Sequence, residues 1–223
     1  MLKDSASCTA IMKKDKTKIA VAVFSKRAKE YQDKFMDTKL YQESFDLFCH
    51  HITKENADIL ELACGPGNIT KYLLKKRPDF KLLGIDLSLN MIDLARANNP
   101  TATFELMDCR AIDLIDKRYN AIMCGFALPY LSKEEAQDLI THAFRLLASE
   151  GVLYLSTMEG DYSSSGFQRS SSGDEIYIHF HEEEYLVRAL KATGFEIVEL
   201  QRKHYLIQEG TETTDIIIIA IKR

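Results

Sequence analysis

The chain has 223 residues, of which 46% are hydrophobic and 28% are charged, and its formal net charge is −4 at pH 7. This composition is typical of one folded globular domain and excludes a disordered chain. Without a polybasic run a nucleic-acid partner is not favoured, and without a long apolar run no membrane segment is expected. The first residues lack the order of a signal peptide, so we expect a cytoplasmic protein.

The N-terminal part of the chain is expected to be an arm followed by helices. Residues 1–18 are polar and are interpreted as an arm. From residue 19 to residue 51, apolar residues recur every three to four positions, which indicates helices. We expect two helices, with a break near residues 37–38.

After residue 57 the sequence alternates between strand and helix patterns. Strands are predicted at residues 58–62, 80–86, 103–107, 121–124, 152–156, 176–180, 196–200 and 215–221. Helices are predicted at residues 68–76, 89–98, 133–148 and 182–192, the second and third of them capped by Ser88 and by the Ser132–Glu135 capping box. The Ser/Gly-rich residues 163–173 are expected to form a loop. Such alternation predicts an α/β fold, a mostly parallel doubly wound sheet with helices on both faces.

The cysteines give no sign of a metal or disulfide framework. The chain has five of them, at scattered positions and without C-x-x-C spacing, which favours reduced thiols. Cys49, His50 and His51 are consecutive, and adjacent side chains diverge on a helix or strand. We therefore expect no metal site.

The stretch ILELACGPGNIT, residues 59–70, predicts a strand, a glycine turn and a helix. It lacks the lysine of a phosphate-binding Walker loop, and Thr70 replaces the third glycine of a dinucleotide-binding turn. A nucleoside that carries positive charge instead of phosphate suits this turn, because Glu61 precedes it. Gly65 and Gly67 lack Cβ atoms and allow close approach of the backbone. S-adenosyl-L-methionine, with its ammonium and sulfonium groups, is such a ligand.

Acidic residues also follow the next two predicted strands. Asp86 ends one strand and can accept hydrogen bonds from both ribose hydroxyls of a nucleoside. Asp108 ends the next strand and can accept from an adenine amino group, while the N–H of Cys109 donates to the ring. The carboxyl ends of parallel strands meet at one edge, where ligands of such sheets bind. Taken singly, Glu61 could be an ordinary strand-end carboxylate and Asp86 a helix cap.

The segments LELACGPGN, GIDLSLNMIDLAR and FELMDCRAID resemble motifs of the class I S-adenosylmethionine-dependent methyltransferases, especially the group that acts on small molecules. The resemblance covers residues 57–157, and more weakly the chain from Gly194 onward. It implies a Rossmann-like seven-stranded sheet in the order 3-2-1-4-5-7-6 with the last strand antiparallel. The donor-binding residues that it implies are Glu61, Ala63, Gly65, Gly67, Asp86, Leu87, Met91, Asp108, Cys109 and Phe126, and Tyr31 is added as a lid contact.

The resemblance also implies a division of the chain. Residues 1–50 are expected to form an arm and a helical lid. Residues 51–223 are expected to form the methyltransferase domain, with a cap insertion near residues 158–181. The lid and the cap are expected to close over the donor and to define the acceptor. The aromatic residues of the lid helices could equally be packing between helices.

The acceptor is expected to be a small molecule. Leu128-Pro129-Tyr130 lacks the amide or carboxylate that base-methylating enzymes place before the proline pair. Tyr130, His179 and His181 are the candidates for a general base, if the acceptor must lose a proton. In IYIHFH, residues 176–181, the two histidines share one face with Tyr177. That face either lines an acceptor pocket or is the solvent side of an edge strand, with His181 capping the next helix; we favour the solvent side.

Three classes of function stay open at this point. The first is a small-molecule methyltransferase, which is the favoured one. The second is a protein or RNA methyltransferase of the same fold, and the third is a non-catalytic protein that binds the donor or a nicotinamide nucleotide. A monomer or a homodimer is expected.

Overall fold

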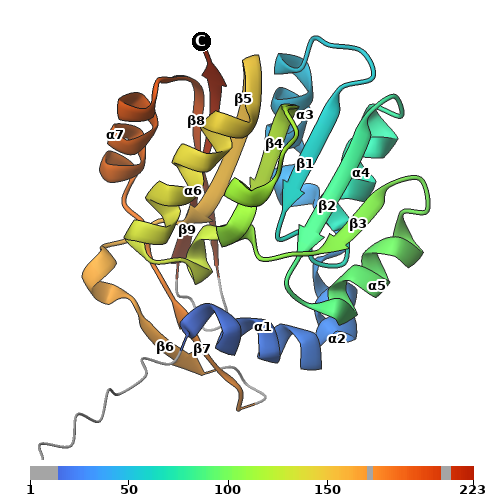
Figure 1. Ribbon diagram of the computed structural model, residues 1–223. Coiled ribbons are helices and arrows are strands. Elements are labelled where there is room, and N and C mark those ends of the chain that lie inside the picture. Colours follow the sequence, from blue (N-terminus) through green and yellow to red (C-terminus); the bar gives the residue numbers. More distant parts are fainter. Residues whose placement is uncertain (1–14, 170–172, 207–211) are drawn as a thin grey trace, which may run out of the picture.

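A seven-stranded sheet forms the centre of the computed structural model, which describes residues 15–169, 173–206 and 212–223 (Figure 1). In sheet order its strands are β3 (Thr103–Leu106), β2 (Lys81–Asp86), β1 (Asp58–Leu62), β4 (Tyr119–Gly125), β5 (Leu147–Met158), β9 (Glu212–Lys222) and β8 (Phe195–Leu206). The pairs from β3 to β5 are parallel, whereas β9 is antiparallel to both β5 and β8. Numbered within the sheet, this is the expected order 3-2-1-4-5-7-6.

Helices cover both faces of the sheet (Figure 1). The helices are α1 (Lys16–Lys26), α2 (Ala28–Phe35), α3 (Gln42–His51), α4 (Asn68–Lys76), α5 (Leu89–Asn98), α6 (Lys133–Leu146) and α7 (Glu183–Thr193). Short 3₁₀ helices are η1 (Lys39–Tyr41), η2 (Cys109–Leu114), η3 (Leu128–Tyr130) and η4 (Tyr162–Ser164). Each described helix is too short or too polar to span a membrane.

Strand β5 shows how alternation divides the core between the two faces. Leu153 and Leu155 pack in a cluster with side chains of α6 and α7. Val152 and Tyr154 pack in another cluster with side chains of α3 and α4. Because neighbouring side chains of a strand point to opposite faces, both faces of β5 are apolar and both need a cover of helices.

Two N-terminal expectations are wrong in detail. The helical segment divides at Arg27, as well as near Asp37, so that α1 and α2 precede the break that the sequence indicated. The apolar spacing continues across Arg27, and periodicity alone therefore cannot reveal this turn. Helix α1 also begins at Lys16, inside the part interpreted as an arm; residues 1–14 of that arm lie outside the described residues.

The Ser/Gly-rich stretch is not entirely a loop. It contains β6 (Gly166–Arg169), which pairs antiparallel with β7 (Glu175–Ile178). The hairpin lies between β5 and α7 in the chain, and α1 lies beside it across the carboxyl edge of the sheet (Figure 1). Backbone hydrogen bonds to β7 hold β6 in place, so its strand is formed by its partner in spite of a composition typical of loops.

Gly67 is a position where the fold requires glycine. It precedes α4 in the left-handed region, with φ +75°, and an added Cβ would lie 2.3 Å from Nδ2 of Asn99. That amide cannot move away freely, because it donates to the carbonyls of Gly67 and Ala95. We expect Gly67→Ala to lower the free energy of unfolding by about 2–4 kcal/mol, from positive-φ strain and overpacking together.

Chemical denaturation measures this loss, and Gly166→Ala is the matched control. An added Cβ at Gly166 meets no atom within 4 Å. The control should therefore change the free energy of unfolding by less than about 0.5 kcal/mol. Equal stabilities of the two variants would show that the turn tolerates a side chain.

Candidate functional site

A cavity lies where β1, β2, β3 and β4 end, under helix α1. Ten of the fourteen residues that the sequence indicated for the site line it: Tyr31, Ala63, Gly65, Asp86, Leu87, Met91, Asp108, Cys109, Phe126 and Tyr130. They come from α2, from the loops and turns after four neighbouring strands, from α5 and from η3. The topology therefore brings together residues that are up to 99 positions apart in the chain (130 − 31).

The glycine turn and Asp86 form one hydrogen-bonded unit. The N–H of Gly65 donates to Oδ2 of Asp86 at 2.9 Å, and the N–H of Ser88 donates to Oδ1 at 2.8 Å. Both carboxylate oxygens are thereby fixed in position, and each keeps lone-pair capacity for a further donor. Burial raises the pKa of Asp86, an effect that these backbone donors oppose.

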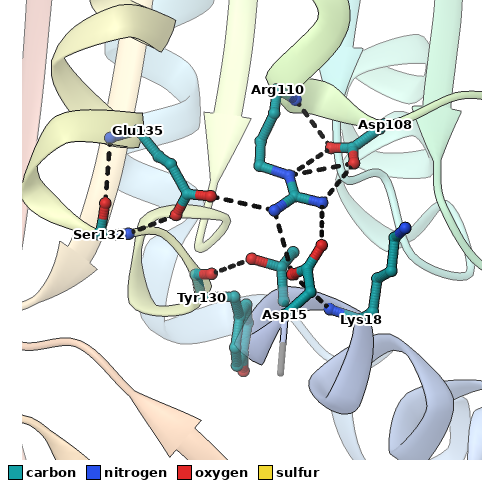
Figure 2. A network of polar contacts seen from close by, with 8 residues as sticks. Asp15, Lys18, Asp108, Arg110, Tyr130, Ser132 and Glu135 are labelled. Atoms are coloured by element: carbon teal, nitrogen blue, oxygen red, sulfur yellow. Dashed lines mark hydrogen bonds and ion pairs between the residues drawn. The ribbon is translucent and has the colours of Figure 1, made fainter. Parts of the chain in front are cut away.

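Asp108 lines the cavity but is already engaged by a residue that we did not anticipate. Nε of Arg110 donates to Oδ1 of Asp108 at 3.1 Å and Nη2 donates to Oδ2 at 2.7 Å. The same guanidinium reaches Asp15 and Glu135 (Figure 2). The sequence did carry a signal for this ion pair, namely the Asp-x-Arg spacing at a strand end, because side chains two residues apart can pair across such a turn.

Helix α1, within the residues expected to form an arm and a helical lid, provides a wall of the cavity, and the sequence indicated none of its lining residues as site residues. Thr17, Ala20, Val21 and Phe24 line the cavity. Asp15 caps this helix by accepting from the N–H of Lys18 (Figure 2). The hydroxyl of Thr17 donates to the carbonyl of Tyr130 at 2.8 Å. Asp15 is a signal for a helix start, but it and Thr17 lie within residues 1–18, the stretch interpreted as an arm, whereas Ala20 and Phe24 lie within the stretch predicted to be helical.

Glu61 and Gly67 lie next to the cavity without lining it. Glu61 is buried and accepts a hydrogen bond from the hydroxyl of Thr70. Burial raises the pKa of Glu61 to about 8, and the neighbouring Asp86 adds to the rise. At neutral pH, therefore, most of this carboxyl is protonated in the structure. Gly67 shapes the turn at the start of α4.

The two candidate histidines are buried away from the cavity. His179 is 4% exposed and His181 is 0% exposed, so the solvent-side interpretation is wrong. Nε2 of His181 lies 2.8 Å from the carbonyl of Leu128, and Nδ1 contacts the hydroxyl of Tyr185. Glu182, not His181, occupies the cap position of α7. η3 packs against this segment, where the N–H of His179 donates to the carbonyl of Pro129. Both histidine side chains are thereby kept from water.

Burial also sets the protonation of the candidate bases. It lowers the pKa of His181 to about 4 and lowers that of His179. It raises the pKa of Tyr31 to about 12 and that of Tyr130 well above its usual range. At neutral pH the two tyrosines therefore present hydroxyl groups and not phenolates to the cavity.

The charged side chains that line the cavity are acidic. Among the described residues that line it, Asp86 and Asp108 are ionisable acids, and none is a lysine, an arginine or a histidine. Arg110 lies behind Asp108, where three carboxylates bind it. A ligand with positive charge is thus compatible with the cavity, whereas a pyrophosphate would meet the carboxylate of Asp86, which no basic side chain of the lining balances.

The sheet order, the glycine turn after β1 and the acid after β2 define the fold of class I S-adenosylmethionine-dependent methyltransferases. A solved structure of magnesium protoporphyrin IX methyltransferase from Synechocystis, with bound S-adenosylmethionine, has the same fold. It superimposes with a TM-score of 0.69 and 16% identity, and the alignment covers 95% of this chain and 99% of that one.

Residues 59–151 match the family described as a methyltransferase domain. A trans-aconitate 2-methyltransferase from Variovorax paradoxus is 37% identical over 99 residues, which are 44% of this chain and 38% of that protein. A carboxy-S-adenosyl-L-methionine synthase from Campylobacter hominis is 26% identical over 189 residues, 72% of this chain and 80% of that protein. Residues 59–151 are therefore similar to a methyltransferase domain, and the chain has the fold of class I S-adenosylmethionine-dependent methyltransferases. It spans about two fifths of the length of the Variovorax relative.

Proposed function

We propose that the chain binds S-adenosyl-L-methionine in this cavity and transfers the methyl group to a small-molecule acceptor. The observation that carries the proposal is the grouping of Gly65, Asp86 and Asp108 around one cavity. In this assignment the turn at residues 61–67 holds the methionine part, and Asp86 accepts from the ribose hydroxyls. Leu87, Met91, Asp108 and Cys109 surround the adenine, and Phe126 faces the methyl group.

The sulfonium of the donor supplies an activated methyl group, which an acceptor lone pair attacks while the carbon–sulfur bond breaks and its electrons return to sulfur. The chain contributes alignment and exclusion of water. Phe126 has φ +58°, and its N–H donates to the hydroxyl of Ser156 at 3.1 Å. The ring of Tyr41 packs against its side chain at 5.0 Å between centroids. Alignment of two reactants alone can supply about 7–11 kcal/mol of the barrier.

The acceptor that the lining favours is uncharged or cationic. Phe24, Phe126 and Tyr130 give the cavity apolar and aromatic surfaces, and the described lining offers no basic side chain. A free polycarboxylic acid, such as the substrate named for the Variovorax relative, therefore has no counter-ion here. Tyr130 can hold an acceptor by a hydrogen bond. His179 and His181 lie behind η3 and do not line the cavity, so they are not proposed as bases.

Calorimetric titration tests the donor assignment. We expect S-adenosylmethionine and S-adenosylhomocysteine to bind with one site per chain, and NAD to give no heat of binding. Radiolabelled donor then identifies the acceptor in a panel that contains amines, phenols and carboxylic acids. Binding of NAD without binding of S-adenosylhomocysteine would refute the proposal.

A second candidate follows from the extent of the match to the Campylobacter relative, which spans most of both chains. The chain could modify S-adenosylmethionine itself and form a carboxylated donor. The lining argues against this, because no described basic side chain in the cavity would balance an added carboxylate. Mass spectrometry of the nucleoside that co-purifies with the chain separates the two: an unmodified donor or S-adenosylhomocysteine supports methyl transfer, and a carboxylated one supports the alternative.

A further inference from the structure

Helix α1 stands between the cavity and solvent. Four of its side chains line the cavity, and the helix crosses the edge of the sheet where the strands end (Figure 1). A nucleoside held in the cavity would contact α1 as well as the strand ends, so its release requires these contacts to break. The contacts that hold α1 over the cavity therefore affect the rate at which a nucleoside binds and leaves.

The start of α1 is held by the guanidinium of Arg110, by the hydroxyl of Thr17, which donates to the carbonyl of Tyr130, and by Lys16, whose Nζ lies over the ring of Tyr177. Nη1 and Nη2 of Arg110 donate to Oδ1 and Oδ2 of Asp15 at 3.1 and 3.0 Å, a two-pronged pairing (Figure 2). Nε and Nη2 also donate to Asp108, and Nη1 donates to Oε1 of Glu135 at 3.0 Å. The side chain of Arg110 is 20% exposed, so water screens these contacts only in part.

We propose that Arg110 is a positioning residue that connects the adenine end of the donor site to α1. Its pairing with Asp15 holds the helix closed and sets the rate at which the nucleoside product leaves. The inference rests on the proposed function, because it assigns a role to the same cavity. It goes beyond that function by identifying the ion pair that controls exchange.

Arg110 links ligand binding at Asp108 to the closure of α1. Asp108, which lines the cavity, and Asp15, which starts α1, share Nη2 of Arg110. A movement of α1 away from the cavity removes one partner of the guanidinium and changes how firmly it holds Asp108. Conversely, a ligand that donates a hydrogen bond to Asp108 changes how strongly Asp108 pairs with Arg110, and so how strongly Arg110 pairs with Asp15. Occupancy of the adenine end and closure of the helix are therefore coupled.

The other end of α1 is held by a separate set of contacts. Nζ of Lys26 and Nε of Arg27, just past the helix, pair with Asp174 at 2.9 and 3.0 Å. Lys26 is 62% exposed, and an exposed pair contributes little because solvent and salt screen it. The Arg27–Asp174 pair, with side chains 30% and 15% exposed, is about as buried as the Arg110–Asp15 pair at 20% and 32%. The two ends differ because Arg110 also pairs with Asp108, which lines the cavity.

Asp15→Asn and Glu135→Gln form a matched pair of variants. Each removes one carboxylate charge from Arg110. Asparagine still caps α1, and glutamine still completes the capping box of α6 with Ser132. Only Asp15→Asn loosens the contact to α1. Both variants should therefore fold, and thermal melting verifies this.

Stopped-flow displacement of S-adenosylhomocysteine measures the release rate. We expect Asp15→Asn to release it about tenfold faster than the wild type, and Glu135→Gln to stay within about twofold. Higher salt should speed release from the wild type more than from Asp15→Asn. Equal rates in the two variants, or a rate in Asp15→Asn equal to that of the wild type, overturn the proposal.

Hydrogen exchange of the ligand-free protein keeps this test separate from the donor assignment. Amides of residues 16–26 should exchange faster in Asp15→Asn than in Glu135→Gln. If the wild type binds no S-adenosylhomocysteine, the proposed function fails, and the exchange comparison still decides whether Asp15 and Arg110 hold the helix. Unchanged exchange in Asp15→Asn overturns the proposal by itself.

Discussion

Replacement of Asp86 by alanine should weaken the binding of S-adenosylhomocysteine at least tenfold, about 1.4 kcal/mol on the affinity scale. Asp86 lines the cavity, and its oxygens are held in place by the N–H groups of Gly65 and Ser88. Loss of two hydrogen bonds to a charged acceptor, at about 1.5–3 kcal/mol each, would raise the dissociation constant by about two to four powers of ten. Calorimetry gives the constants for both proteins.

Two further variants make this result interpretable. Asp93 is an exposed acid on α5 whose nearest cation is Arg96, and Asp93→Ala should leave affinity unchanged within about twofold. Asp86→Asn keeps an acceptor oxygen for the turn, and so it separates loss of ligand contacts from loss of the turn. An unchanged dissociation constant in Asp86→Ala, with the fold intact, would remove this residue from the site.

The sequence was sufficient for the elements whose signals are local. Ser88 accepts from the N–H of Met91, and Ser132 and Glu135 form the complete capping box, so α5 and α6 begin where expected. Strand β1 and helix α4 have the predicted bounds, because an apolar run, a glycine turn and a helix pattern follow one another directly. β8 continues six residues beyond its predicted end, since pairing with β9 sustains a strand whose side chains alternate between exposed and half-buried.

The site was predictable where it follows the strand ends. Acids at residues 86 and 108 meet because parallel strands place their carboxyl ends at one edge. A helical lid was expected, but which side chains of α1 line the cavity was not, because their contacts join residues over a hundred positions apart, such as Thr17 and Tyr130. The burial of His179 and His181 depends on how η3 packs on the segment after β7, and no pattern within residues 176–181 reports it.

Glu61 should make the stability of the protein depend on pH. Its carboxyl has an ordinary pKa of 4.5, and burial raises this to about 8 in the folded protein. Between these values the folded state binds more protons than the unfolded state, so the free energy of unfolding falls as pH rises. The window of 3.5 units (8 − 4.5) at about 1.4 kcal/mol per unit sets an upper limit of about 5 kcal/mol. We expect the free energy of unfolding to fall by about half of this limit.

Glu61→Gln is the control, because the amide is neutral throughout and can still accept from the hydroxyl of Thr70. Urea titrations at pH 5 and pH 8 should show a loss of about 2–3 kcal/mol in the wild type relative to this variant. Parallel pH profiles would mean that Glu61 is already ionised in the folded protein.

The same titration with saturating S-adenosylhomocysteine tests whether Glu61 contacts the ligand. If the ammonium of the ligand reaches this carboxyl, its positive charge favours ionisation, and binding near pH 7 releases a proton. The heat of binding then changes with the ionisation enthalpy of the buffer in the wild type and not in Glu61→Gln. The difference between wild type and variant in their pH dependence should also shrink. If neither occurs, Glu61 is a buried structural acid beneath the turn, and the methionine part is held by the backbone of residues 63–65 without it.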